Sequence, residues 1–267
     1  MKTQISYYGG KQRMVSTILP LLPPQDTYDL YCEPAVGGGA VFHAKEPSPV
    51  EVINDLDGRV VNFYRMVKSQ YELLDKLIKQ TPHSRQAHKE AEHVLKNQDL
   101  YSNVKIAWAF WVQTNMSFAS SIFAGFAYAR KKNSCEKKMF NKREAFDKNY
   151  ASRLELVQIE QEDMIKVIKS RDSERSFFYV DPPYFNSECG HYKGYTQEQF
   201  VNLLTTLAGI KGRFLLSSYE SDVLQEHTDI NGWDTIKKTM PIAVSHKVKK
   251  DKIEVLTANY PITKLVA

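Results

Sequence analysis

The chain has 267 residues and a net charge of +5, with 42% hydrophobic and 12% aromatic residues, enough to bury a core in one large domain or two modest ones. No apolar run is long enough to span a membrane, and residues 1–5 do not begin the long apolar segment of a signal peptide. Three widely spaced cysteines (Cys32, Cys135 and Cys189) indicate neither a disulfide framework nor a zinc site, so we expect a reduced, cytoplasmic protein that binds no metal.

The first two predicted strands end at glycines and at an acid. Residues 28–32 are typical of a strand, and a glycine turn leads from them into a helix that begins near Ala40. A second strand over 49–53 ends at Asn54 and Asp55, and an acid in that place can bind ribose hydroxyls. Glycines let the backbone approach a ligand, although a glycine turn alone is more often a plain connection. The spacing is not Gly-x-Gly-x-x-Gly and no lysine follows, so neither a dinucleotide nor a nucleoside triphosphate is favoured.

The middle of the chain changes character. Apolar residues follow helical spacing over 60–78 and again over about 84–113, whereas 114–150 mixes small, aromatic and basic residues without a clear period. From Arg130 to Arg153 there are nine Lys or Arg residues against three acids, and a second basic cluster lies at 246–252. One such run is usually a solvated face, but two of them favour a polyanionic partner.

Strands and helices alternate in the rest of the chain. The pattern predicts strands over 154–159, 176–181 and 213–217, helices over 162–169 and 197–207, and closing strands near 233–240 and 252–260. Such alternation is typical of a mostly parallel, doubly wound α/β sheet of the Rossmann-like kind. We predict that residues 1–82 and 151–267 form this catalytic domain and that 83–150 is a mostly helical subdomain inserted into it.

The segment Asp181-Pro182-Pro183-Tyr184 follows a short apolar and aromatic strand. An acid there lies at the carboxyl edge of the sheet, where open α/β folds bind ligands. Two prolines stiffen the loop and remove two backbone donors, which leaves nearby carbonyls available to a ligand. An acid, a carbonyl and an aromatic ring together suit a planar group with an exocyclic amine. The alternative is that the prolines only end the strand and Tyr184 covers the core.

Four segments, in their order along the chain, resemble the Dam-like, D12-class adenine-specific DNA methyltransferases. They are Tyr-Tyr-Gly-Gly-Lys (7–11), Glu-Pro-Ala-Val-Gly-Gly-Gly-Ala-Val-Phe (33–42), Asn-Asp-Leu-Asp (54–57) and Asp-Pro-Pro-Tyr (181–184), with weaker matches at 195–200, 215–219 and 246–252. Residues 83–150 match only by position, where the family keeps its target-recognition region. The resemblance implies a class I methyltransferase fold, S-adenosylmethionine as methyl donor, and transfer to N6 of adenine in double-stranded DNA.

The resemblance also implies which residues bind the cofactor. Tyr7 and Lys11 would contact it, the turn from Glu33 to Gly39 would surround its methionine part, and Asp55 would bind its ribose. Close relatives of Dam have Trp at position 7, and the glycine motif usually has Phe where this chain has Ala35, which removes a contact near the cofactor. The predicted cofactor-binding residues are Tyr7, Lys11, Glu33, Pro34, Gly37, Gly39, Asp55, Asp163 and Asp181.

The predicted catalytic residues are Asp181, Pro182, Pro183 and Tyr184. Asp181 and the Pro182 carbonyl would accept the two N6–H groups and so direct the nitrogen lone pair at the methyl group. Tyr184 would stack on the adenine, which must leave the duplex because its N6 is otherwise paired.

Double-stranded DNA is the expected partner, bound through the basic clusters. The predicted DNA-binding residues are Asn115, Ser117, Phe118, Arg130, Lys131, Lys132, Lys137, Lys138, Lys249 and Lys250. Phe123 is a further candidate, although Phe118, Phe123 and Phe126 would alternatively form the subdomain's own small core. We expect a monomer or weak dimer, with a cognate restriction endonuclease as a further partner.

Three other functions compete with this interpretation. A cytosine-N4 methyltransferase usually has Ser or Asn in place of the first Asp, so Asp181 disfavours it. Methyltransferases acting on RNA or on protein amides use the same loop chemistry, typically with Asn first. A DNA-binding module without catalysis is the third alternative, but every catalytic motif position is intact.

Overall fold

The computed structural model describes residues 1–7, 9–185, 195–240 and 252–262. The chain divides into two compact units. The first comprises Met1–Val15, Gly37–Lys45 and Asp55–Gln161, and the second comprises Ser16–Val36, Glu46–Asn54 and Glu162–Ala267. No helix among the described residues is long and apolar enough to cross a membrane.

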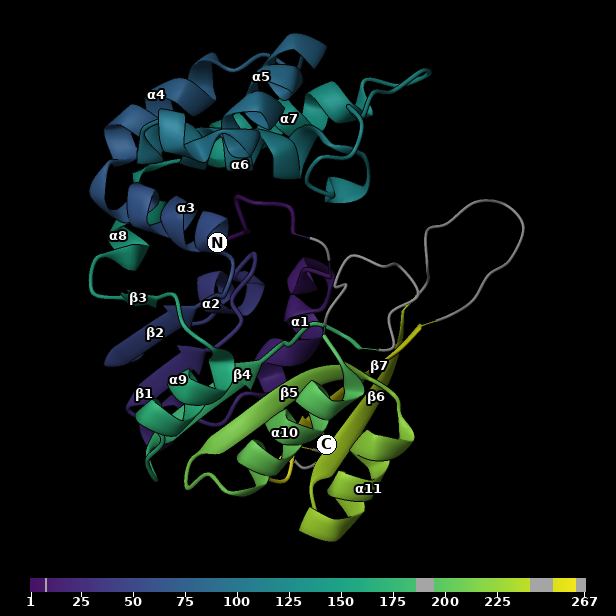
Figure 1. The fold of residues 1–267 in the computed structure, drawn as a ribbon. Helices are drawn as coiled ribbons and strands as arrows, with labels where there is room; N and C mark the ends of the chain where they lie inside the picture. Colours follow the sequence, from purple (N-terminus) through teal and green to yellow (C-terminus); the bar gives the residue numbers. More distant parts are fainter. Residues whose placement is uncertain (8, 186–194, 241–251, 263–267) are drawn as a thin grey trace. The chain divides into compact units, whose positions relative to one another are not determined.

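The second unit contains six of the seven strands that the described residues form (Figure 1), in the order β2-β1-β4-β5-β7-β6. Neighbours among β2, β1, β4 and β5 run parallel, whereas β7 pairs antiparallel with both β5 and β6. The carboxyl ends of the parallel strands therefore meet at one edge, together with the amino-terminal part of β7. The strands are β1 (Leu30–Glu33), β2 (Val50–Asn54), β4 (Ser176–Val180), β5 (Arg213–Tyr219), β6 (Asp234–Met240) and β7 (Lys252–Ala258).

Side chains of this sheet alternate between two faces. Phe178 and Val180 of β4 pack into a buried apolar cluster with residues of three helices, α9 (Met164–Arg171), α10 (Gln197–Ala208) and α11 (Asp222–Asn231). Phe177 of β4 lies on the other face, where its ring contacts Tyr28, Tyr31 and Tyr260. Tyr179 is on that second face too, so the face that ends at the Asp181 loop is lined by aromatic and polar side chains.

The first unit is mostly helical, and its central helix is α6. Residues Ile106 to Met116 of α6 are all buried, and the helix packs against α3, α4, α5 and α7. The helices are α2 (Ala40–Ala44), α3 (Gly58–Ser69), α4 (Tyr71–Gln80), α5 (Arg85–Lys96), α6 (Asn103–Met116), α7 (Ser134–Ala145) and α8 (Lys148–Leu154), with the short strand β3 (Gln158–Glu160). Short helical turns complete the chain at η1 (Lys11–Arg13), α1 (Val15–Ile18), η2 (Leu19–Leu21), η3 (Gln25–Thr27), η4 (Gln98–Leu100) and η5 (Phe118–Ser120).

The predicted fold class is confirmed, since the sheet is mixed, mostly parallel and covered by helices. The strand expected over 154–159 is wrong in its first half, because Asp147 caps α8 and this helix continues to Leu154. Helix α11 was not predicted, although Ser221 caps its start and Gly232 ends it with φ of 63°. The first unit joins α5–α7 with α3 and α4, so its bounds differ from 83–150, and the inserted subdomain stays a prediction.

Candidate active site

The turn after β1 is tied to the end of β2 inside the second unit. The Val36 amide donates to the Asn54 carbonyl at 2.8 Å, and Asn54 Nδ2 donates to the Pro34 carbonyl at 2.8 Å. Asn54 also exchanges two hydrogen bonds with the Glu162 backbone, each 2.9 Å long. One buried amide thus fixes three loops at the carboxyl edge of the sheet. The sequence analysis placed Asn54 in a motif but assigned it no role.

Glycines 37 and 39 adopt the left-handed backbone conformation, with φ of 47° and 61°. A Cβ atom on Gly37 would lie 3.1 Å from Cδ1 of Tyr7, so the tyrosine ring packs directly on the glycine backbone. The Tyr64 hydroxyl donates to the Gly37 carbonyl at 3.0 Å, which also fixes the carbonyl group of this glycine. Glycine is therefore required at position 37 for its conformation and for the close approach of Tyr7.

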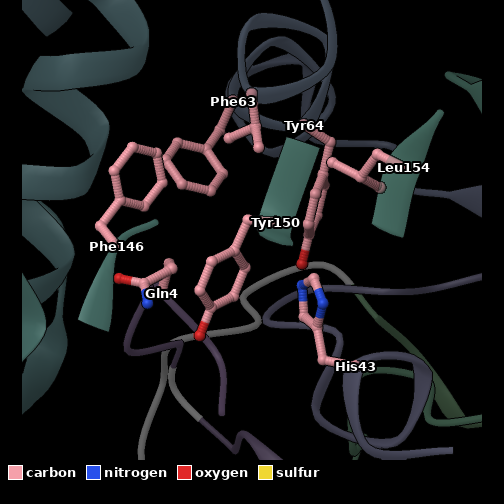
Figure 2. Close-up of a pocket in the computed structure, with 8 residues that line it drawn as sticks. Gln4, His43, Phe63, Tyr64, Phe146, Tyr150 and Leu154 are labelled. Carbon is pink, nitrogen blue, oxygen red and sulfur yellow. The ribbon is translucent and has the colours of Figure 1, made fainter. Parts of the chain in front are cut away.

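Helix α2, directly after this turn, is fixed by aromatic packing in the first unit. Figure 2 shows His43 and the rings of Tyr64 and Tyr150 together in one pocket, with centroids 6.1 Å and 5.4 Å from His43. Burial, with a smaller effect of Arg153, lowers the pKa of His43 to about 3, so the imidazole is neutral. The Arg153 guanidinium lies 3.9 Å above the Phe42 ring. This pocket stabilises α2, and none of its lining residues was predicted as a site residue.

Asp55 organises the loop after β2. Its Oδ2 accepts from the Gly37 amide at 2.8 Å and its Oδ1 accepts from the Asp57 amide at 2.9 Å. Burial raises the pKa of Asp55 to about 6, against the opposing effect of these two backbone donors. A carboxylate has about four acceptor sites, so Asp55 keeps capacity for hydroxyl donors after making these two bonds.

The segment 7–11 forms a tight turn in the first unit, of which Tyr8 lies outside the described residues. The Gly10 amide donates to the Tyr7 carbonyl at 3.1 Å, and Gly9 has a φ of 75°. Lys11 is buried, and its Nζ donates to the Gly9 carbonyl at 2.8 Å. An aromatic ring and a buried ammonium are thus both held by this turn, and the structure brings Tyr7, Gly37 and Asp55 together.

The loop after β4 joins Tyr184 to two carboxyl groups. The Tyr184 hydroxyl lies 3.2 Å from Oδ1 of Asp181, and it donates a hydrogen bond to Glu254 of β7. The Tyr184 ring meets the Tyr219 ring edge-on, with centroids 4.3 Å apart. Burial and the neighbouring charges of Asp181 and Glu254 raise the pKa of Tyr184 well above its ordinary value, so its hydroxyl keeps its proton. Glu254 had not been predicted as a site residue.

Two further tyrosines support the same edge of the sheet. Tyr31 donates to the buried carboxylate of Glu33 at 2.6 Å. The hydroxyls of Tyr179 and Ser217 lie 2.9 Å apart. Burial is the largest cause, and the charge of Asp181 the next, of the raised pKa of Tyr179. Glu33 and Asp181 therefore lie among neutral hydroxyl groups.

Asp163 is exposed and caps helix α9, where its carboxylate accepts from the amides of Ile165 and Lys166 at 2.9 Å and 3.2 Å. Its geometry explains why an acid suits this position without any ligand. Its predicted contact with the cofactor remains a prediction.

The loop 117–127 of the first unit presents aromatic side chains to solvent. Phe118 is 72% exposed and Phe123 is 43% exposed, so the alternative in which these two form a small core is wrong. Phe126 is half-buried and stacks on His83 at 4.7 Å. Ala119, Ser120 and Phe123 have positive φ angles of 53°, 56° and 67°.

Gln113, which is fully buried in α6, fixes this strained loop through hydrogen bonds. Its Oε1 accepts from the Phe123 amide and from the Ser117 hydroxyl, each at 3.1 Å. Its Nε2 donates to the His88 carbonyl at 2.9 Å. Gln113 was not predicted, because a glutamine in an apolar helix carries no sequence signal for the loop that it supports.

Asn115 and Ser117 are corrections to the predicted DNA contacts. Asn115 is buried and its Nδ2 donates to the carbonyls of Gln4 and Trp111, at 3.0 Å and 2.9 Å. Ser117 is buried and its hydroxyl contacts Gln113 and His88. Both side chains satisfy the packing around α6 and do not reach the surface of the unit. We leave both out of the proposed DNA contacts.

The basic residues follow the aromatic loop. Arg130, Lys131, Lys132, Lys137 and Lys138 are exposed. Lys138 also donates to the Asn115 carbonyl at 3.3 Å. The Arg130 guanidinium lies 5.9 Å from the centre of the exposed Tyr128 ring. Lys249 and Lys250 lie outside the described residues.

In the part of the chain that the structure describes, no group of three His, Cys, Asp or Glu side chains could hold a metal ion.

A mostly parallel sheet with one antiparallel strand set between β5 and β6, and with polar residues on the loops after β1, β2 and β4, is the arrangement of an α/β methyltransferase. Over residues 7–239 the sequence matches the D12 class N6 adenine-specific DNA methyltransferase family, and the chain belongs to that family. The resemblance drawn from the four motifs is thereby confirmed, and the protein is an adenine-specific DNA methyltransferase.

A curated relative covers nearly the same length. The type II methyltransferase M1.LlaDCHI of Lactococcus lactis subsp. cremoris is 27% identical over 276 residues, which cover 94% of this chain and 93% of the relative. Among solved structures, precorrin-6y C5,15-methyltransferase from Geobacter metallireducens GS-15 is 11% identical with a TM-score of 0.39, over 97% of this chain and 98% of that one. A likeness at that level carries no argument.

Proposed function

We propose that this methyltransferase uses Asp181-Pro182-Pro183-Tyr184 to transfer a methyl group from S-adenosylmethionine to N6 of an adenine flipped out of double-stranded DNA. The observation that carries the proposal is the Asp181 loop. It follows a central parallel strand, contains two residues without backbone donors, and lies beside buried Tyr179 and half-buried Tyr184, whose hydroxyls stay protonated.

The residues around the glycine turn fit a nucleoside-and-carboxylate ligand. The backbone at Gly37 has a left-handed conformation and packs closely on Tyr7, and Asp55 retains acceptor capacity for ribose hydroxyls. Lys11 is a buried cation suited to a carboxylate. Bound S-adenosylmethionine would supply an electrophilic methyl group. We propose that the cofactor-binding residues are Tyr7, Lys11, Glu33, Pro34, Gly37, Gly39, Asp55, Asp163 and Asp181.

At the target base, hydrogen-bond acceptors of the loop promote methyl transfer. Asp181 and the Pro182 carbonyl accept from the two N6–H groups, which favours a tetrahedral nitrogen and stabilises the positive charge that develops there. Pro183 keeps the loop stiff, and Tyr184 supplies an aromatic surface beside the base. Moving the adenine out of the duplex costs a few kcal/mol, which contacts with DNA must offset.

The exposed aromatic and basic residues of the first unit fit DNA. Phe118 and Phe123 offer rings that stack on bases, and cationic side chains bind phosphates irrespective of sequence. The proposed DNA-binding residues are Phe118, Phe123, Arg130, Lys131, Lys132, Lys137 and Lys138, with Lys249 and Lys250 carried over from the sequence. We also propose a cytoplasmic role beside a cognate restriction endonuclease, with the chain acting as a monomer or weak dimer; the Lactococcus relative is named a type II methyltransferase.

The test is methyl transfer from labelled S-adenosylmethionine to unmethylated bacteriophage DNA, followed by identification of the product nucleoside. Asp181→Ala is expected to lower turnover by about 10³-fold, as loss of a preorganised group at the reacting atom does. Cofactor binding measured by calorimetry is largely kept, because the other proposed cofactor-binding residues remain. Asp229→Ala, which changes an exposed acid of α11, is the matched control. N4-methylcytosine as the product, or unchanged turnover by Asp181→Ala, would refute the proposal.

A further inference from the structure

Glu254 is a buried acid outside every motif that the sequence analysis used. It is 7% exposed, and it lies beyond the residues that match the family. Its place follows from the sheet topology. Because β7 runs antiparallel to β5, Glu254 pairs with Tyr219, the last residue of β5. An early residue of β7 is thereby brought to the edge at which the parallel strands end.

The Tyr184 hydroxyl has one proton and two carboxyl neighbours. Glu254 is the nearer acceptor, and Oδ1 of Asp181 lies 3.2 Å away. The raised pKa of Tyr184 means that this proton stays on the hydroxyl instead of being lost. When the proton points at Glu254, it does not occupy Oδ1 of Asp181. When it points at Asp181, that oxygen already accepts a hydrogen bond before any substrate arrives.

We propose that Glu254 is a positioning residue for methyl transfer, which draws the Tyr184 hydroxyl proton away from Asp181 and so spares, for the adenine N6–H group, the Oδ1 lone pair that this proton would otherwise take. This inference rests on the proposed role of Asp181. Glu254 also fixes the Tyr184 ring, together with the edge-on contact from Tyr219.

Glu254→Gln separates the charge from the shape. Glutamine keeps the size of the side chain but brings an N–H donor, which competes for the Tyr184 oxygen and favours turning the hydroxyl proton toward Asp181. We expect kcat to fall about tenfold, at the scale of one hydrogen bond to a charged group, while KM for S-adenosylmethionine is unchanged. Glu220→Gln is the matched control, because Glu220 is an exposed acid paired with Lys237 just after β5.

Tyr184→Phe removes the proton through which Glu254 is argued to act. The kcat of this variant is the reference for the cycle, and in its background Glu254→Gln should have no further effect on kcat. Such a non-additive double-mutant cycle is the result that a merely structural role for Glu254 would not give. Wild-type kcat for Glu254→Gln, or the same tenfold loss in the Tyr184→Phe background, would overturn the proposal.

Two further variants keep the test decisive. Glu254→Asp retracts the carboxylate by one methylene, so if Glu254→Gln does not fold, a smaller kcat loss that disappears in the Tyr184→Phe background supports the inference, and one that persists opposes it. Asp181→Asn is measured in parallel with bacteriophage DNA. If Asp181→Asn retains turnover, the proposed function fails; if only Glu254→Gln retains it, the inference alone fails.

Discussion

Asp55 combines a structural role with the binding role that we propose for it. The backbone amides of Gly37 and Asp57 donate to it, and these hydrogen bonds hold the glycine turn and the start of the loop before α3. Because burial raises its pKa from 3.8 to about 6, the folded protein takes up a proton there more readily than the unfolded chain. Its contribution to stability is therefore largest below pH 4 and is lost as the pH rises through about 6.

Cofactor binding should have the opposite dependence on pH. Ribose hydroxyls donate to the ionised carboxylate, so we expect the affinity for S-adenosylmethionine to fall as the pH decreases below about 6, where Asp55 is protonated. Asp55→Asn should bind more weakly at pH 8 and should lose this dependence. Calorimetric titration between pH 5 and pH 8 measures both proteins. A wild-type affinity that stays constant over this range would contradict the assignment of Asp55.

At the scale of elements, the glycine turn follows strand β1 and precedes helix α2, and Gly37 in it has a left-handed backbone conformation. Gly37→Ala should weaken cofactor binding at least tenfold. The new methyl group would meet Tyr7 and the residue would keep a left-handed conformation that costs about 1–2 kcal/mol outside glycine.

The control for this change is Gly209→Ala at the end of α10, where φ is −96° and the nearest atom to an added Cβ is 3.7 Å away. Cofactor affinity and melting temperature are measured for both variants. Equal behaviour of the two would show that the turn has no role in binding.

Whether the sequence could predict a site residue depended on how that residue is positioned. Asp55 and Asp181 were predictable because each directly follows a strand, and Gly37 because it lies in the turn after one, so the local pattern determines their places. Asn54, Gln113 and Glu254 were not, because each acts on backbone or side chains of loops that only tertiary structure brings near.

Errors within the middle of the chain have a similar origin. Helix α6 is buried over most of its length, so Asn115 near its end and Ser117 just after it resemble surface residues in sequence yet hydrogen-bond inside the unit. Helix α7 has one buried residue, Met139, and therefore shows no amphipathic period. Conversely, the exposure of Phe118 follows from the positive φ angles of the loop, which no sequence pattern of Ala119 and Ser120 suggests.

For the whole molecule, the distribution of charge predicts a strong effect of salt on DNA binding. Each phosphate contact contributes about 0.9 to the slope of log affinity against log salt concentration. Lys131→Ala combined with Lys132→Ala should reduce that slope by about 1.8, with little effect on cofactor binding. Lys169→Ala, an exposed lysine of α9, is the control. Fluorescence anisotropy with labelled duplex DNA at several salt concentrations gives the slopes, and an unchanged slope would exclude these lysines from the interface.

Strand β7 follows β6 in the chain but lies between β5 and β6 in the sheet. During synthesis, the Asp181 loop, β5 and β6 therefore leave the ribosome before β7, the strand that lies between β5 and β6 in the sheet. Until residue 258 has emerged, β5 has an open edge and Tyr184 lacks its partner Glu254. A nascent chain released at residue 240 would contain all four motifs but neither β7 nor the Glu254 carboxylate that the Tyr184 hydroxyl contacts.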